Sequence, residues 1–143
     1  MQTFLPYANF RKSARCLDRV RCFKQVVECR QILATAGVRL KKKDGTWTKS
    51  THPHHPIHKI WQGYIEALKF YHNCFLDQSL KNGYNTKIRH LRVGPVSEIE
   101  FPPFIGNEIF HASHRSNLLR KDADYYGQFG WGEPDNLPYV WGV

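Results

Sequence analysis

The feature that most constrains the fold is a broad apolar stripe at helical spacing over residues 56–82. Large apolar side chains recur there every three or four positions, and the run ends at Asn82 and Gly83, a pair typical of a left-handed helix cap. The stripe consists of Ile60, Trp61, Tyr64, Ile65, Leu68, Tyr71, Phe75, Leu76 and Leu80. So wide a stripe predicts a long central helix that the rest of the chain buries.

Two other segments share this period. Residues 13–36 repeat apolar side chains along one face, and Gly37 follows them as a stop signal. Residues 107–121 form a shorter stretch of the same kind. We therefore predict a mainly α protein: a compact single-domain three-helix bundle with long loops, extending over residues 1–143.

The remaining segments are predicted to be loops. Residues 38–49 alternate on either side of an Asp-Gly pair, which favours a small β-hairpin. The wider stretch 38–56 is interpreted as a basic loop insertion, either a basic finger or a solvated surface loop. Residues 87–103 contain Gly-Pro and Pro-Pro pairs and are predicted to run extended over the surface, and residues 132–143 are expected to be a C-terminal extension.

The charge balance points to a polyanionic partner. Twenty-one Lys and Arg residues against 12 Asp and Glu give a net charge of +9. The basic residues recur along the chain and are not collected in a tail, which indicates a charged face on a folded domain. Such a face suits nucleic acid.

No stretch approaches the roughly 18 apolar residues of a membrane span, so no membrane partner is expected. The first residues lack the basic start and apolar run of a signal peptide, and we therefore expect an intracellular, cytoplasmic protein with access to DNA. The four cysteines form no CxxC pair and are predicted to be small buried thiols.

The last third of the chain combines cations with aromatic rings. A predicted helix carries Arg115, Arg120 and Lys121, and four rings follow within seven residues. These rings are Tyr125, Tyr126, Phe129 and Trp131. Cations suit phosphates and flat rings suit bases, so this segment is a candidate nucleic-acid surface. The alternative is that the rings close the core at the end of the chain.

Two histidine groups raise the question of a metal. One group is His52, His54, His55 and His58, and the other is the pair His111 and His114. Prolines interrupt the first group, and no HExxH helix is present. We expect no metal and no other cofactor, and interpret the imidazoles as phosphate contacts or helix caps.

The first predicted helix carries a candidate acid. Gln25 and Glu28 lie three residues apart and are therefore neighbours on the helix surface. A carboxylate at Glu28, among Arg21 and Lys24, should ionise readily and stabilise positive charge on a reacting sugar. An ordinary salt bridge on the helix surface is the other interpretation of the same residues.

The order of these motifs resembles the pyrimidine-dimer DNA glycosylase family, the phage endonuclease V-like proteins. Leu17-Asp18 and Lys24-Gln25 lie on the first helix, His58 opens the second, and the second closes in the Asn82-Gly83 turn. A basic third helix and an aromatic C-terminal segment follow. The resemblance spans most of the chain, and the order of its motifs is more specific than any single one.

The resemblance implies a compact helical enzyme that flips a base out of a duplex and cuts its glycosidic bond through an amine nucleophile. In the family this nucleophile is the N-terminal α-amine, exposed when the initiator Met is removed before a small residue, and a glutamate on the first helix assists it. Here Gln2 is large, so the Met1 amine takes the role. Gln25 falls where the family has its acid, and Glu28 lies one turn further along.

The sequence thus predicts a base-excision enzyme, a DNA N-glycosylase with possible AP-lyase nicking, that acts on a damaged or modified pyrimidine in double-stranded DNA. It is expected to be a monomer. The predicted catalytic residues are Met1, Glu28 and Gln25. The predicted DNA-binding residues are Arg21, Lys24, His58, His114, Arg115, Arg120, Lys121, Tyr125, Tyr126 and Trp131. Two alternatives stand: a nucleic-acid-binding module of the same fold without catalysis, and a metal-dependent nuclease built on the histidine groups.

Overall fold

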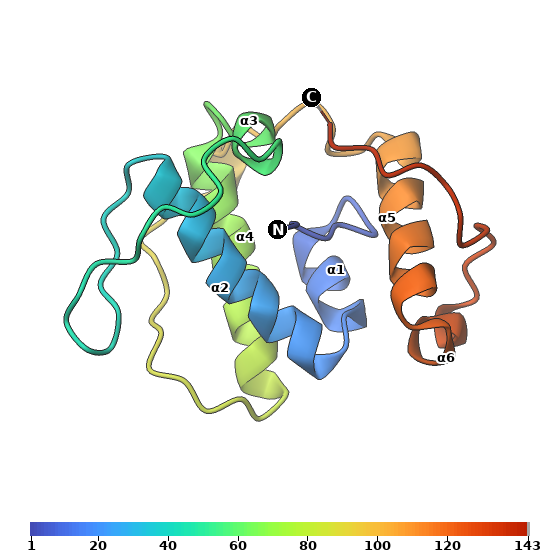
Figure 1. Ribbon diagram of the computed structural model, residues 1–143, viewed down its shortest axis with the longest axis horizontal. Helices are drawn as coiled ribbons and strands as arrows, with labels where there is room; N and C mark the ends of the chain where they lie inside the picture. The colour runs from blue at the N-terminus through green and yellow to red at the C-terminus, as the bar shows by residue number, and fades with distance from the viewer. Residues whose placement is uncertain (143) are drawn as a thin grey trace.

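Two 17-residue helices, α2 (Arg19–Thr35) and α4 (Ile65–Lys81), pack along each other at the centre of the computed structural model, which describes residues 1–142 (Figure 1). The short helix α1 (Phe10–Cys16) packs against α4. Helix α5 (Glu108–Lys121) follows much later in the chain, and the single turn α6 (Ala123–Tyr126) packs at its end. The mainly α prediction is confirmed, and no sheet occurs among the described residues.

The first predicted helix is in fact two. The chain turns at Leu17 and Asp18, which are extended, and the Asp18 carboxylate accepts from Arg21 N at 3.2 Å to cap α2. Asn9 caps α1 in the same way. The prediction of one continuous helix was wrong because apolar spacing continues through the break, while an N-cap aspartate stops the helix locally.

The second predicted helix is also interrupted. A single turn, α3 (Ile57–Ile60), comes first, and α4 begins only at Ile65. Gly63 lies between them with φ +84°, a left-handed conformation that a helix interior does not allow. The predicted end is confirmed, since α4 stops at Lys81 and Gly83 adopts φ +84° beyond it.

The third predicted helix is confirmed, because α5 begins one residue after Asn107, whose side chain accepts from the backbone N–H groups of Ile109 and Phe110. The predicted hairpin is only a turn with one bridge, between Lys41 and Trp47. Residues 87–103 run extended as predicted, apart from one 3₁₀ turn at Val96–Glu98.

The core is aromatic. The Tyr71 ring stacks on Phe75 with centroids 4.1 Å apart, and Phe10 meets Tyr71 edge-on at 5.6 Å. All four cysteines are buried and free, as predicted, and burial raises the pKa of Cys22 and of Cys74 to about 11. Within residues 1–142, no helix is long and apolar enough to span a membrane.

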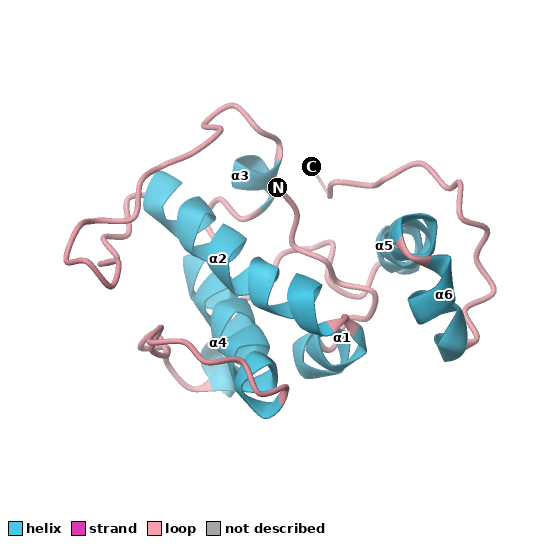
Figure 2. Cartoon of the chain, turned by 60° about the horizontal axis from the view of Figure 1, so that its bottom comes forward, coloured by secondary structure: helices cyan, strands magenta, loops and turns pink. Residues whose placement is uncertain are grey.

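The amino terminus lies in the middle of the molecule. The loop over residues 38–51 lies on one side of it, and α5 with α6 lies on the other, in both views (Figures 1 and 2). The C-terminal segment returns along α5 toward the amino terminus.

Candidate functional site

The first six residues form a buried segment that pairs with no strand. Thr3, Phe4, Leu5 and Pro6 are all buried, and residues 1–6 belong to no helix. Buried backbone N–H and C=O groups need hydrogen-bond partners, and a sheet is not available to provide them here. The partners are side chains, and they come from α2, α4 and α5.

Helix α2 supplies two of these partners one turn apart. The N–H of Gln2 donates to Glu28 Oε2 at 3.0 Å, and the N–H of Phe4 donates to Gln25 Oε1 at 2.8 Å. Residues 2 and 4 of an extended chain face the same way, and so do residues 25 and 28 of a helix. Each backbone N–H of the first pair therefore meets one side chain of the second pair. The structure therefore brings the chain start, Gln25 and Glu28 together.

Gln25 is occupied within the core. It is 1% exposed, and its Oε1 also lies 2.9 Å from the hydroxyl of Tyr71, a buried residue of α4. The same hydroxyl lies 3.0 Å from the carbonyl oxygen of Phe4, so it shares its one proton between two acceptors. An amide at position 25 can hold the first residues in place but cannot exchange a proton at neutral pH.

Helix α5 holds Leu5 by both of its backbone groups. The Leu5 N–H donates to His114 Nδ1 at 2.9 Å. His111 Nε2 accepts from Gly106 N at 2.9 Å, so its proton is on Nδ1 and is donated to the Leu5 carbonyl at 2.7 Å. Burial lowers the pKa of His114 to about 3 and also lowers that of His111, which keeps both rings neutral. The HxxH motif is thus a clamp on one residue.

Arg115 completes this clamp on the next residue. Its Nη1 donates to the Pro6 carbonyl at 2.7 Å, and its guanidinium pairs with Glu133 at 2.7 Å and with Glu108. Arg115 and His114 were predicted to contact DNA phosphates. Both are buried inside the protein, at 7% and 1% exposed, where they have no surface to offer a phosphate.

Glu28 lies beside the chain start and is largely shielded from solvent. Its side chain is only 13% exposed, and Lys24 Nζ is 3.8 Å from its Oε1. The pKa of His55 is lowered, first by burial and next by the charge of the N-terminal ammonium, so His55 lies near the chain start. Burial and then Glu28 raise the pKa of Tyr139, which keeps that phenol protonated. A carboxylate, a cation, an imidazole and a neutral phenol therefore surround the chain start.

Rings from the C-terminal segment pack against His114 and His55. Tyr139 stacks on His114 at 4.7 Å, Trp141 meets Tyr139 at 4.5 Å, and His55 meets Trp141 edge-on at 5.0 Å. No role was predicted for Tyr139 and Trp141, because residues 132–143 were interpreted as a C-terminal extension. Nothing local in the sequence signals a contact between residues more than 80 positions apart.

The predicted aromatic surface is mostly packed against itself. Tyr126 is fully buried, and its hydroxyl hydrogen-bonds the Asp18 carboxylate that also pairs with Arg21 at 3.2 Å. The Trp131 ring stacks on Tyr126 at 5.9 Å. Tyr125 meets Tyr126 edge-on at 4.9 Å and is partly exposed. The interpretation of these rings as a closure of the core fits Tyr126.

Three further predicted DNA-binding residues lie on two separate elements, the end of α5 and α3. Arg120 is exposed but donates to the carbonyls of Asp135 and Leu137 at 2.7 and 2.9 Å, which fixes the C-terminal segment to α5. Lys121 is exposed at the end of the same helix. His58 Nε2 lies 3.1 Å from the Thr51 carbonyl and so holds the 38–51 loop at its end.

The histidine groups form no metal centre in the described part of the chain. Among residues 1–142, no three His, Cys, Asp or Glu side chains are arranged to hold one ion. His111 and His114 use their Nδ1 atoms on Leu5, while His58 binds backbone carbonyls of its own loop.

Comparison with known proteins gives one match. The model of a family described as pyrimidine dimer DNA glycosylase matches residues 1–91, which include the chain start, Gln25, Glu28 and all of α4. No curated protein and no solved structure gives a significant match.

Proposed function

The chain belongs to the pyrimidine dimer DNA glycosylase family, and from this premise we propose that it removes a damaged or modified pyrimidine from duplex DNA and nicks the resulting abasic site. The observation that carries the proposal is the 3.0 Å hydrogen bond between Gln2 N and Glu28 Oε2, which supports an amine nucleophile beside a shielded carboxylate. The protein is proposed to act inside the cell, as a monomer and without a cofactor.

The proposed chemistry begins with the α-amine of Met1. Its nitrogen bonds to C1′ of the flipped nucleotide as the glycosidic C1′–N bond breaks, and the pyrimidine leaves with the bonding electron pair and takes up a proton. The Glu28 carboxylate stabilises the positive charge on the sugar and accepts the amine proton. The proton then passes to O4′ as the ring opens, which leaves an imine between Met1 and C1′.

The imine is what permits nicking. It acidifies the proton on C2′, and loss of this proton lets the 3′ phosphate leave by elimination. The Met1 amine is one residue away from the nitrogen that contacts Glu28, so the two nitrogens are at most about 3.6 Å apart. Gln25 is proposed to be a positioning residue, because it holds the Phe4 N–H and leaves proton transfer to Glu28.

DNA contacts are proposed for the predicted residues that keep exposed surface. These are Arg21, Lys24, His58, Arg120, Lys121, Tyr125 and Trp131. Lys24 lies on the solvent side of Glu28, with a side chain that is 66% exposed, and suits a phosphate next to the reacting nucleotide. His114, Arg115 and Tyr126 receive internal roles in this proposal, since they are buried.

The proposal is tested by borohydride trapping on duplexes that carry an abasic site, a cyclobutane dimer or a modified pyrimidine, followed by mass mapping of the cross-linked peptide. We expect the adduct on the peptide that begins at Met1. Glu28→Gln should lower the rate of base release by about 10²- to 10³-fold, because it removes the charge that stabilises the sugar cation.

Matched variants separate the possible nucleophiles. A variant with two residues added before Met1 moves the amine away and should give no adduct, whereas Lys24→Gln should still give one. An adduct at Lys24, or on a peptide beginning at Gln2, would keep the imine but move its nitrogen. Tight salt-sensitive binding without adduct or released base would instead identify a binding module, and loss of activity with a chelator would identify a metal-dependent nuclease.

A further inference from the structure

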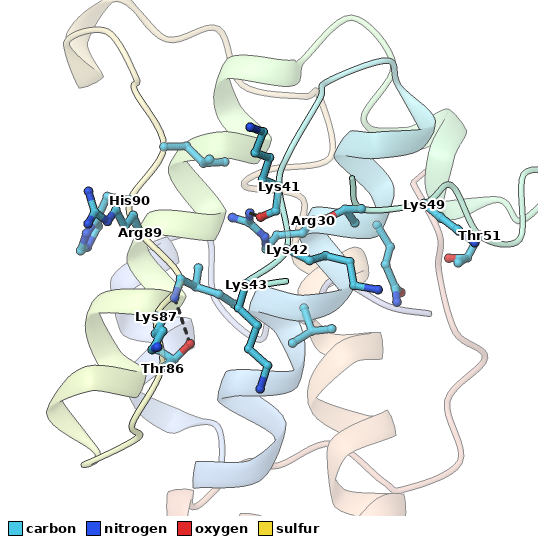
Figure 3. Close-up of a pocket in the computed structure, with 15 residues that line it drawn as sticks. Arg30, Lys41, Lys42, Lys43, Lys49, Thr51, Thr86, Lys87, Arg89 and His90 are labelled. Carbon is cyan, nitrogen blue, oxygen red and sulfur yellow. Dashed lines mark hydrogen bonds between the residues drawn. The ribbon is translucent and has the colours of Figure 1, made fainter. Parts of the chain in front are cut away.

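We infer that a cationic cavity beside the candidate site binds the phosphodiester backbone of DNA on one flank of the target nucleotide. The cavity lies between α2, the loop over residues 38–51 and the segment 84–91, and its volume is about 640 Å³ (Figure 3). This inference rests on the proposed function, because it takes duplex DNA as the substrate.

The lining of the cavity carries one sign of charge. Seven of the chain's 21 Lys and Arg side chains line it, and no Asp or Glu is among its lining residues, all of which lie within the described part of the chain. The loop supplies Lys41, Lys42, Lys43 and Lys49. Like charges gathered around one concave space repel one another and raise the local potential, so an anion bound there is strongly favoured.

Both walls of the cavity are fixed by hydrogen bonds. Arg30 of α2 has Nη1 3.3 Å from His72 Nε2 and Nη2 3.3 Å from the carbonyl oxygen of Lys41, which ties the loop to two helices. On the opposite wall, Asn73 bonds both backbone groups of Leu91, each at 2.8 Å. The space between the walls is therefore built before any ligand enters it.

The chemistry of the lining suits a backbone and not a base. The apolar floor consists of Val27, Ile88 and Leu91, and no Phe, Tyr or Trp is among the described lining residues. Lysine ammonium groups bind phosphate as point charges, whereas base recognition uses stacking rings or paired donors and acceptors. A run of phosphates with its sugars against the floor matches this lining.

The cavity adjoins the chain start. Thr51 lines it and also donates from Oγ1 to the Met1 Sδ at 3.7 Å. The loop and α5 with α6 lie on opposite sides of the amino terminus (Figures 1 and 2). Phosphates in the cavity therefore belong to one flank of a nucleotide held at Glu28. The sequence suggested a basic finger over residues 38–56, but none of the residues predicted to bind DNA lines this cavity.

The test measures binding of an uncleavable abasic-analogue duplex as a function of salt, by fluorescence anisotropy. The variant Lys42→Gln/Lys87→Gln removes one exposed cation from each wall. Each phosphate contact contributes about 0.9 to the slope of log affinity against log salt, so the slope should become shallower by about 1.8. Hydroxyl-radical footprinting of the same variant should lose protection on one flank of the analogue only.

The matched control is Lys69→Gln/Lys81→Gln, which removes two α4 cations that lie outside the cavity lining. An equal change of slope in both variants, or no change in the cavity variant, would overturn the inference. It would also be overturned if tripolyphosphate bound tightly to the wild type but not to the cavity variant while the DNA slope stayed the same, since the cavity would then hold a small free polyanion.

The binding measurement needs no chemistry, and this separates the two proposals. A shallower slope in the cavity variant, together with no trapping by the wild type, supports the cavity and contradicts the imine mechanism. Normal trapping by the wild type, together with an unchanged slope in the cavity variant, supports the imine mechanism and contradicts the cavity.

Discussion

At the scale of single residues, α2 places two side chains with different surroundings beside the amino-terminal segment. Gln25 and Glu28 are one turn apart and touch different nitrogens of the same segment, Phe4 N and Gln2 N. Gln25 is buried and holds Phe4 N, whereas Glu28 is slightly exposed and contacts both Gln2 N and the ammonium of Lys24. A glutamine therefore occurs at the buried position, where an ionised carboxylate would be costly to bury.

The swap of these two side chains tests that division. The double variant Gln25→Glu/Glu28→Gln keeps the composition of α2 but moves the carboxylate inward by one turn. We expect it to give no more borohydride adduct than Glu28→Gln alone, because the acid then contacts Phe4 N and not the chain start. Recovery of trapping in the swapped protein would mean that position 25 can serve the amine.

At the scale of elements, the amino-terminal segment is held by helices that are far away in sequence, and two buried histidines determine how it responds to acid. Burial lowers the pKa of His114 to about 3 and that of His72 to about 4, whereas an unfolded histidine titrates near 6.5. Above pH 6.5 neither state binds a proton at these rings. As the pH falls below 6.5, these two imidazoles become protonated in the unfolded state but stay neutral in the folded state.

The free energy of unfolding should therefore decrease by about 2 kcal/mol between pH 6 and pH 5. Urea unfolding at pH 7, 6, 5.5 and 5 measures this change, in a range above the titration of most carboxylates. The variant His114→Gln, which has no titratable ring, should show about half the dependence. A flat profile in the wild type would show that these rings are protonated in the folded protein.

The positions of the elements were predictable from periodicity, and their interruptions were not. The apolar stripe over residues 56–82 located α4 because burial of one face dictates the spacing. The stripe did not reveal the turn at Gly63. Trp61 beside it is buried although it lies in a turn, so its burial does not distinguish a turn from a helix. The first predicted helix was interrupted in a similar way, because the side chain of Asp18 caps the start of α2.

The candidate site was predictable only in part. The likeness of the motif order pointed to the chain start and Glu28, and the structure brings both together. His114 and Arg115 were assigned to DNA because basic and imidazole groups on a helix look alike in sequence whether they face solvent or a buried carbonyl. Tyr139 and Trp141 reach the site only through the packing of the C-terminal segment on α5, which leaves no local pattern.

At the scale of the whole molecule, a compact helical body carries one long basic loop. Residues 41–47 are all exposed, while most of the apolar side chains of the helices belong to one core cluster. Trypsin cleaves after Lys and Arg in accessible backbone, and it should cut first in this loop, at Lys41, Lys42, Lys43 or Lys49.

Duplex DNA should slow this first cut, because the loop forms one wall of the cationic cavity. The measurement is a time course of limited digestion followed by mass spectrometry, with and without duplex, and digestion of casein under the same conditions reports direct inhibition of the protease. A first cut within α5, or a loop that is cut equally fast with DNA present, would contradict the proposed arrangement.

The hydrogen bonds that hold Leu5 and Pro6 join residues 106 to 109 positions apart in sequence. Because a ribosome makes residues 5 and 6 long before α5, these residues lack these hydrogen-bond partners until α5 has been made. Long-range closures of this kind are slow to form during folding. The placement of residues 5 and 6 therefore depends on a helix that the ribosome makes more than 100 residues later.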